Sequence, residues 1–320
     1  MKYWITGILF FICVGMTRRI CDHNVTDYTP ITDLVNLTFS GYTGGLYPDG
    51  NDIPAAHFAN GMTHATQIIP RNETGQADAH GKIGLLVLGY STAAMTGRTF
   101  SEMIRYAGVD TALQVIIGAQ GGQDLRAMIK PETTYWDSVD AAIQNKGLTR
   151  EQVQIIWMSS GDIAAYTLPF AEQTQHGIDA YQQVLLRIRQ LFPAVQIVFI
   201  SDRPYAGFIG KNEQPGPKEL AEPSGYYHSW TVKWLIEKQI QQVPGFTYAE
   251  LPFIDWGPTL WTNGTFGDKR GYTWDCLDAG KGGIHATSKG RMKEAARLYN
   301  YFTKHPYTTQ LFSTVSPSLK

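Results

Sequence analysis

Two residues far apart in the sequence have the chemistry of an acyl-transfer pair, Ser91 and His285. Ser91 follows the apolar run Ile83–Leu88 and the dipeptide Gly89-Tyr90, and His285 stands in a glycine-rich loop ahead of a predicted terminal helix. A serine hydroxyl attacks an ester carbonyl when a histidine takes up its proton. The plainer interpretations are a strand-end turn for the serine and a structural role for the histidine. The pair is therefore a hypothesis that depends on the rest of the chain.

A second glycine-rich segment, Gly118–Gln123, follows the apolar run Ala112–Ile117. Its glycines allow a tight turn and expose backbone N–H groups toward whatever lies above the end of the strand. No Gly-Lys-Ser or Gly-Lys-Thr follows, which excludes a phosphate-binding loop, and the glycine spacing does not fit a dinucleotide-binding fingerprint. We therefore expect backbone amides, and not a phosphate motif, at this point.

Four apolar runs predict buried strands, at residues 83–88, 112–117, 153–158 and 195–200. Ser91 and the segment Gly118–Gln123 follow the first two of these runs. Predicted helices lie before, between and after them, at residues 57–69, 99–107, 124–129, 136–146, 170–192, 225–242 and 287–303. This alternation predicts a parallel sheet with helices on both faces. Each of the four strands ends in a loop rich in Gly, Ser or Asp, so we expect the site at the carboxyl edge of the sheet.

The composition suits a globular protein. The 320 residues are 43% hydrophobic, which is enough for one large α/β domain or two small ones. A net charge of −1 argues against a nucleic-acid groove, which needs a basic face. Turn residues dominate the first part of the chain, which predicts an irregular N-terminal extension (residues 21–80) packed on a main domain (residues 81–305). Residues 306–320 are predicted to form a C-terminal tail.

The first 20 residues have the pattern of a secretory signal peptide. Lys2 precedes the uncharged run Tyr3–Met16, which is shorter than the about 20 residues that span a bilayer. A signal-anchor that stays attached is the alternative. The mature chain is therefore expected in the periplasm or outside the cell, without stable membrane insertion.

An oxidising compartment has two further consequences. Removal of the signal leaves Cys21 and Cys276, which predict one disulfide, with two unpaired thiols as the alternative. Asn-x-Thr sequons, which matter only if the source is eukaryotic, begin at Asn24, Asn36, Asn72 and Asn263.

The order of six segments resembles the SGNH (GDSL-type) hydrolases, and more closely a subgroup of secreted, bacterial-type members. The segments cover most of the chain: GGLYPDGNDIPAAH, KIGLLVLGYST, IIGAQGGQ, VKWLIEKQI, WGPTLWTNG and GGIHATSKGR. Their order and spacing carry the resemblance more than any one segment. The resemblance implies an esterase with a flavodoxin-like three-layer α/β/α sandwich around a mostly parallel sheet.

The resemblance also assigns roles to three residues. Ser91 matches the nucleophile, and its own backbone N–H matches one donor to the oxyanion. Gly122 matches the glycine that supplies a second donor, and His285 matches the general base. Two or three such donors are each typically worth a few kcal/mol of transition-state stabilisation.

The chain departs from the family pattern near these residues. Gly282 stands where the family commonly has an Asp three residues before the histidine, and Tyr90 stands where Asp is common. The loop after the third strand has no Asn to act as an oxyanion donor. The missing acid can be replaced by a backbone carbonyl that holds the histidine ring, or by Asp278 or Asp275 as the orienting acid. The missing Asn can be replaced by the hydroxyl of Ser160 as a donor to the oxyanion.

The favoured hypothesis is a secreted serine esterase that removes an acetyl group from a carbohydrate. Aromatic residues near His285 in the sequence would suit a sugar ring, and those predicted to bind substrate are Trp256, Trp261 and Trp274. Loop packing is the alternative for these side chains, and a lipid or short-chain ester is the alternative substrate. Gly282 and the absent Asn motivate a second hypothesis, a catalytically impaired protein of this fold that binds a glycan or another protein.

No metal or other cofactor is expected. The sequence has no His-Glu-x-x-His motif and no paired-cysteine site. His57 and His64 are seven residues apart on a predicted helix and are expected to pack instead of binding a metal. Asp202 and Arg203, after the fourth predicted strand, are expected to be structural.

Overall fold

The structure is a computed structural model and describes residues 28–109, 111–130, 134–211 and 215–312. Its centre is a sheet of five parallel strands: β3 (Ile83–Gly89), β4 (Leu113–Ile117), β5 (Val153–Ser159), β6 (Ile197–Ile200) and β7 (Phe253–Trp256). Their spatial order is β4-β3-β5-β6-β7. Counted within this sheet, the order is 2-1-3-4-5, which is the flavodoxin-like order.

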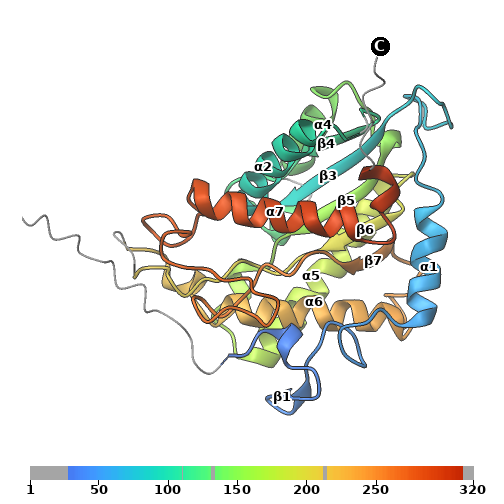
Figure 1. Cartoon of the computed structure of the whole chain (residues 1–320). Helices are drawn as coiled ribbons and strands as arrows, with labels where there is room; N and C mark the ends of the chain where they lie inside the picture. The colour runs from blue at the N-terminus through green and yellow to red at the C-terminus, as the bar shows by residue number, and fades with distance from the viewer. Residues whose placement is uncertain (1–27, 110, 131–133, 212–214, 313–320) are drawn as a thin grey trace, which may run out of the picture.

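Helices cover both faces of the sheet (Figure 1). One face carries α2 (Ser91–Ala107) and α7 (Ser288–Lys304), and the other carries α3 (Leu125–Ile129), α4 (Tyr135–Gln144), α5 (Phe170–Leu191) and α6 (Ser224–Ile240). Successive residues of β3 point to opposite faces, so Leu85 and Val87 pack with α2 and α7 while Leu86 and Leu88 pack with α4 and α5. Both faces are buried, which explains the unbroken apolar runs of the sequence. The three-layer α/β/α fold that the resemblance implied is confirmed.

The N-terminal extension contains a small hairpin and a helix: β1 (Thr38–Phe39), β2 (Tyr42–Thr43) and α1 (Ala55–Ala65). It is attached to the main sheet by buried hydrogen bonds. The Tyr47 hydroxyl donates to Asp255 at 2.7 Å, and the indole N–H of Trp256 donates to the carbonyl of Leu46 at 2.7 Å. These bonds attach the first part of the extension to the β7 edge of the sheet, whereas Ile69 and Arg71 lie at the start of β5, where both are hydrogen-bonded to the side chain of Gln154.

Short 3-10 helices complete the described elements: η1 (Ile31–Asp33), η2 (Arg150–Gln152), η3 (Ile163–Ala165), η4 (Lys218–Leu220) and η5 (Thr309–Phe312). Tyr307 and Phe312 are buried against the core, so the part of the predicted tail that the structure describes is packed. In the described part of the chain, no helix has the length and apolarity needed to cross a membrane.

Some predictions about the two ends of the chain lie outside the described residues. These are the signal peptide, the sequon at Asn24 and the Cys21 half of the predicted disulfide. Of the described sequons, Asn36 is exposed, whereas Asn263 is buried and its amide donates to the carbonyl of Tyr28 at 2.8 Å. The amide nitrogen that a glycan would need at Asn263 is therefore already engaged.

Candidate active site

Ser91 lies at a sharp turn from β3 into α2. Gly89 has a φ of 133°, and a Cβ there would lie 2.1 Å from the carbonyl oxygen of Ser159, so only glycine fits. Tyr90 is extended, and Ser91 is the first residue of α2. No side chain caps this helix, and the partial positive charge at its N-terminus favours negative charge near Ser91.

His285 is held by a loop that turns back on itself just before α7. Its carbonyl accepts the N–H of Gly280 at 2.7 Å. Gly283 has a φ of 78°, and a Cβ there would lie 2.1 Å from the carbonyl oxygen of Phe208. This glycine therefore allows the loop to pack closely against the backbone at Phe208. Thr287 then caps α7 through its hydroxyl, which accepts the N–H of Gly290 at 3.2 Å.

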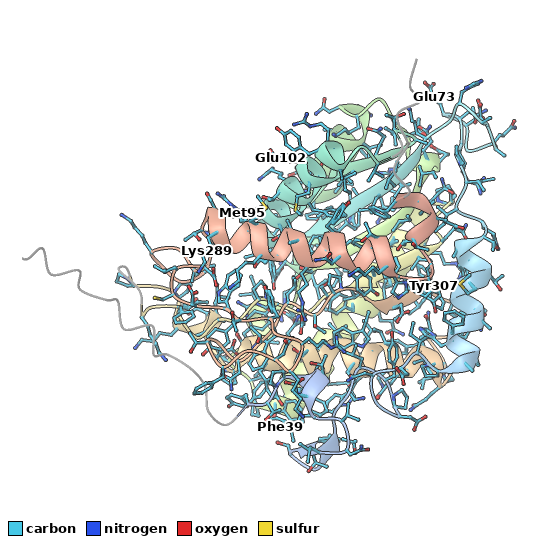
Figure 2. The ribbon with its side chains drawn as sticks, in the orientation of Figure 1. Phe39, Glu73, Met95, Glu102, Lys289 and Tyr307 are labelled. Carbon is cyan, nitrogen blue, oxygen red and sulfur yellow. The ribbon has the colours of Figure 1, made fainter. Side chains whose placement is uncertain are left out.

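The two elements bring the predicted pair together. The Nε2 atom of His285 lies 2.8 Å from the Oγ atom of Ser91, which is hydrogen-bond distance. In Figure 2, Met95 near the start of α2 and Lys289 near the start of α7 mark the same end of the two packed helices. The geometry is that of a nucleophile in contact with its base.

The predicted orienting acid does not take part in this contact. Asp278 is fully buried, and its carboxylate is bound by the ammonium groups of Lys293 at 2.5 Å and Lys289 at 3.0 Å. It also accepts the N–H of Asp275 at 2.9 Å. Within the described residues, no hydrogen bond is formed by Nδ1 of His285. The structure therefore corrects the role predicted for Asp278: the two lysines at the start of α7 hold its carboxylate in their own ion pairs.

The loop after β4 brings Gly122 to the serine. A Cβ at Gly121 would lie 3.9 Å from Cβ of Ser91, and Gly122, with a φ of 71°, lines the same cavity as Ser91. Gln120 fixes the loop, because its N–H donates to the carbonyl of Gly89 at 2.9 Å and its side-chain amide donates to the carbonyl of Tyr135 at 2.9 Å. Among the described residues the N–H of Gly122 has no acceptor, so it is available to an oxyanion.

Ser160 is not part of this arrangement. Its side chain is fully buried, its hydroxyl has no hydrogen-bond partner among the described residues, and its carbonyl accepts the hydroxyl of Tyr181 at 2.6 Å. The residue lies outside the lining of the cavity at Ser91. The prediction that Ser160 replaces the missing asparagine is therefore not supported by its position.

A cavity of about 250 Å³ opens beside Ser91 and His285. Most of its wall is apolar or aromatic: Tyr90, Ile163, Tyr166, Pro204, Tyr205, Ala206, Ile209, Leu220, Trp274 and Ile284. The polar exceptions are Thr92, Arg203 and Glu294. The hydroxyl of Thr92 is buried without a hydrogen-bond partner among the described residues. A small cavity of this kind can hold an acyl group next to the nucleophile.

Two of the polar residues are ionisable and line the same cavity. Arg203 is almost fully buried, lies 4.7 Å over the ring of Tyr166 and donates to the hydroxyl of Ser224 at 2.8 Å. Glu294, on α7, accepts a hydrogen bond from the hydroxyl of Thr96, and burial raises its pKa to about 7. Glu294 could not be identified from the sequence, because a single glutamate in an amphipathic helix carries no distinguishing pattern.

Only one of the three tryptophans predicted to bind substrate reaches the cavity. Trp274 lines it. Trp256 is buried in β7 with its indole N–H on Leu46, and Trp261 is buried with its indole N–H on the carboxylate of Glu222 at 2.9 Å. The structure therefore corrects the prediction for Trp256 and Trp261, which pack in the core instead of facing Ser91.

No group of three or more His, Cys, Asp or Glu side chains that could hold a metal ion occurs among the described residues. His57 is buried, stacks on Phe253 and lies 2.9 Å from the hydroxyl of Tyr248. Asp202 accepts the N–H of Trp261 at 3.1 Å, and burial raises its pKa to about 6. Both side chains are engaged in packing and internal hydrogen bonds.

No protein-family model matches this sequence, and no curated protein matches it significantly. Solved structures to which the chain is similar include a protein from Slackia heliotrinireducens described as an SGNH hydrolase, with 15% identity, a TM-score of 0.37 and coverage of 69% of this chain and 99% of the other. The lipase Lip_vut3 from a goat rumen metagenome has 14% identity, a TM-score of 0.38 and coverage of 69% and 97%. An acetyl xylan esterase has 13% identity, a TM-score of 0.38 and coverage of 68% and 98%. Identities and TM-scores this low carry no argument about the activity of this chain.

Proposed function

We propose that the protein is a serine hydrolase of carboxylic esters. The observation that supports this most strongly is the 2.8 Å contact between Oγ of Ser91 and Nε2 of His285 at the N-terminus of an uncapped helix. In the proposed reaction, Oγ attacks the ester carbonyl while its proton passes to Nε2. The same proton then goes to the departing alkoxide, which leaves an acyl group on Ser91. Water, deprotonated by His285, hydrolyses the acyl-enzyme and the proton returns to Oγ.

The oxyanion of each tetrahedral intermediate would be bound by backbone N–H groups. The candidates are the N–H of Ser91, at the start of α2, and the N–H of Gly122, which has no acceptor within the described residues. Loss of one such donor typically costs about 10²- to 10³-fold in turnover. The backbone thus supplies the charge stabilisation for which the predicted Ser160 hydroxyl is not placed.

The proposed machinery is a dyad and not a triad. For Nε2 of His285 to accept the serine proton, the resting ring carries its proton on Nδ1, and no described residue accepts that proton. In a serine protease, replacing the orienting carboxylate by its amide lowers turnover about 10⁴-fold. We therefore expect slow turnover compared with a full triad.

For the substrate, we propose an ester with a short acyl group, and an acetyl ester of a carbohydrate as the favoured case. The cavity of about 250 Å³ supports a small acyl group. Trp274 in its wall supports a sugar ring, although the other two tryptophans do not contribute. Extracytoplasmic location, proposed from the N-terminal sequence, would place the enzyme where such glycans occur.

A second function is favoured by one observation, the absence of an acceptor for Nδ1 of His285 within the described part of the chain. The protein would then bind a glycan or another protein at the same cavity without turnover. Kinetics with p-nitrophenyl esters distinguish the two. The hydrolase proposal predicts a saturable rate that is highest for acetyl, falls for octanoyl, and is lost in Ser91→Ala.

The control for that experiment is Ser101→Ala, because Ser101 lies on the same helix but three turns away from the cavity. A rate in wild type that equals the rate in Ser91→Ala, with both proteins folded, would contradict the hydrolase proposal. It would leave the binding protein as the better account.

A further inference from the structure

A second cavity lies on the other side of α7 from the packed α2 helix and shares no lining residue with the one at Ser91. Its volume is about 580 Å³. The N-terminal extension, the segment after β7 and the second half of α7 form its walls, and the residues that matter here are Asn51, Arg270, Arg297, Asn300 and Lys304. Three of these five side chains are cations.

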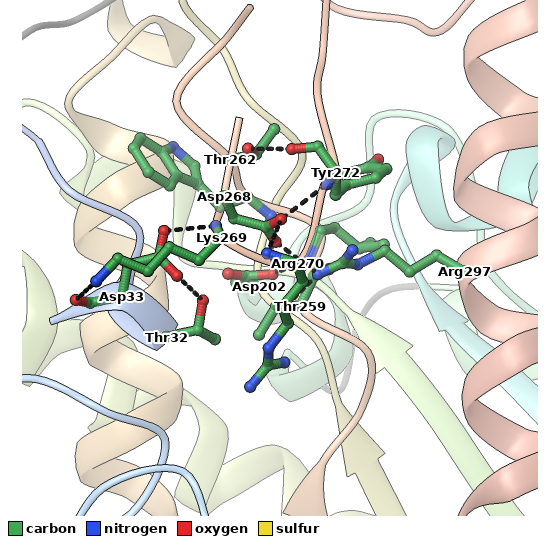
Figure 3. A network of polar contacts seen from close by, with 12 residues as sticks. Thr32, Asp33, Asp202, Thr259, Thr262, Asp268, Lys269, Arg270, Tyr272 and Arg297 are labelled. Carbon is green, nitrogen blue, oxygen red and sulfur yellow. Dashed lines mark hydrogen bonds and ion pairs between the residues drawn. The ribbon is translucent and has the colours of Figure 1, made fainter. Parts of the chain in front are cut away.

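One of the cations is fixed and already neutralised. Arg297 forms an ion pair with Asp268 at 3.1 Å, donates to the hydroxyl of Thr259 at 2.8 Å and lies 4.2 Å over the ring of Tyr272 (Figure 3). Asp268 also accepts the N–H groups of Arg270 and Tyr272. Asp268 thus pairs with the guanidinium of Arg297 and meets Arg270 only through the backbone N–H of that residue.

The other two cations have no such partner. Among the described residues, the guanidinium of Arg270 and the ammonium of Lys304 form no hydrogen bond and no ion pair, and no dashed line in Figure 3 ends on the guanidinium of Arg270. Burial of part of the side chain and the charge of Arg297 lower the pKa of Arg270. Asp268 and Asp33 act in the opposite direction, and the side chain of Arg270 is exposed where it lines the cavity.

The nearby carboxylates Asp268 and Asp33 offset this charge only in part, and neither forms an ion pair with the guanidinium of Arg270 among the described residues. Asp33 accepts the backbone N–H of Lys269 at 2.8 Å and the hydroxyl of Thr32 at 3.2 Å (Figure 3). Asp255 is fully buried behind the wall and accepts the hydroxyl of Tyr47. Burial lowers the pKa of His305, which also lines the cavity, so this ring adds no charge at neutral pH.

We propose that this cavity binds a tetrahedral oxyanion, phosphate or sulfate, either free or as the ester group of a larger ligand. Arg270 and Lys304 supply two exposed cations that have no ion-pair partner among the described residues, and the guanidinium fork of Arg270 matches the geometry of a dianion's oxygens. The side-chain amide of Asn300, which forms no hydrogen bond within the described part of the chain, adds a neutral donor at the same wall. The site is independent of the proposed hydrolase activity.

Isothermal titration calorimetry of the full chain with inorganic phosphate, at constant ionic strength set by sodium chloride, tests this. The expected result is saturable binding that weakens about tenfold or more in Arg270→Ala and in Lys304→Ala. Arg187→Ala, which removes an exposed arginine from α5 on the opposite face of the sheet, should leave it unchanged. Ser91→Ala should also bind phosphate as the wild type does, which separates this site from the catalytic one.

Glucose 6-phosphate and inorganic sulfate, titrated in parallel, identify the source of the anion. Tighter binding of the sugar phosphate than of inorganic phosphate would assign the site to an ester group on a larger ligand, and equal or weaker binding would assign it to the free anion. If none of the three probes saturates the wild type, or if the Arg270 and Lys304 variants bind as the wild type does, the proposal is wrong.

Discussion

At the scale of single residues, His285 depends on very few contacts for its orientation. Its Nε2 meets Ser91, while the position three residues earlier is Gly282. A Cβ at Gly282 would find only the carbonyl oxygen of Pro215 within 4 Å, at 3.9 Å, so a side chain fits there. Asp278, the acid predicted to orient the ring, is instead ion-paired with Lys289 and Lys293. The orienting acid is therefore absent because residue 282 is a glycine, and not because the loop lacks room for a side chain.

This leads to a gain-of-function prediction. Gly282→Asp should raise kcat for p-nitrophenyl acetate by about tenfold or more, because a carboxylate beside Nδ1 stabilises the imidazolium that forms during attack. Gly282→Asn is the matched control, since it has the same shape without the charge. Equal rates for the two variants would show that a carboxylate at this position does not act on His285.

A second residue-scale prediction concerns Glu294. Burial raises its pKa to about 7 from 4.5, so folding favours the protonated form. The free energy of unfolding should therefore fall as pH rises from about 4.5 to 7, by up to about 3 kcal/mol, and stay level above that range. Glu294→Gln, whose amide oxygen still accepts the hydroxyl of Thr96, should remove this part of the decline.

Urea denaturation at pH 5 and pH 8 measures the effect. The difference in unfolding free energy between the two pH values should be smaller in Glu294→Gln than in wild type. Glu172→Gln, at an exposed position of α5, should behave as wild type. The same pH dependence in both variants would contradict the raised pKa.

At the scale of elements, the site is made by the ends of two helices that pack on the same face of the sheet. The start of α2 carries Ser91, and the start of α7 follows His285 by three residues. Thr287 connects cap and loop, because its hydroxyl accepts the N–H of Gly290 and donates to the carbonyl of Leu277 at 2.7 Å. The cap therefore fixes both the helix and the segment that holds the base.

Thr287→Ala should lower the free energy of unfolding by about 1 kcal/mol through loss of the cap. It should also lower kcat more than it raises KM, since His285 loses its fixed position relative to Ser91. Thr287→Ser keeps the hydroxyl and should restore both quantities. A Ser variant as impaired as the Ala variant would mean that the methyl group, and not the cap, is what matters.

Much of the element pattern could be predicted from the sequence. The four longer apolar runs became β3, β4, β5 and β6, because strands buried on both faces need unbroken apolar residues. The strand β7 was missed, since its four residues include Asp255, a buried acid paired with Tyr47 that no local pattern reveals. The early start of α2 at Ser91 was also missed, because Ser, Thr and Gly in its first turns have weak helix propensity.

The sequence predicted those site residues whose place is set by the backbone, at the end of a strand or the start of a helix. Ser91, Gly122 and His285 come together because strand ends and a helix start place them at one sheet edge. Side-chain direction was not predictable. Asp278 forms an ion pair with Lys293 on α7. Trp256 and Trp261 point into the core, where their indole N–H groups donate to Leu46 and Glu222. No local pattern in the sequence indicates these partners.

At the scale of the whole molecule, the N-terminal extension acts as part of the core. Lys233 on α6 donates to the carbonyl of Tyr47 at 2.9 Å, and the hydroxyl of Tyr47 donates to the buried carboxylate of Asp255. Burial raises the pKa of Tyr47 well above its usual range, so the hydroxyl keeps its proton and remains a donor. The extension and the β7 edge of the sheet should therefore unfold together.

Tyr47→Phe tests this coupling. It leaves Asp255 with one fewer donor in a dry environment, which should cost about 1–3 kcal/mol in the free energy of unfolding. Tyr42→Phe, at an exposed position of the same extension, should cost almost nothing. A single cooperative transition in both variants is expected. A second transition in the wild type would instead show that the extension unfolds on its own.

The central claim is that Ser91 is a nucleophile activated by His285, and covalent labelling with a fluorophosphonate probe tests it most directly. We expect a single adduct on Ser91 by mass spectrometry in the wild type, none in Ser91→Ala and a strongly reduced rate in His285→Ala, with circular dichroism confirming that all three are folded. Folded wild type that does not react, or that reacts equally fast without His285, would contradict the mechanism.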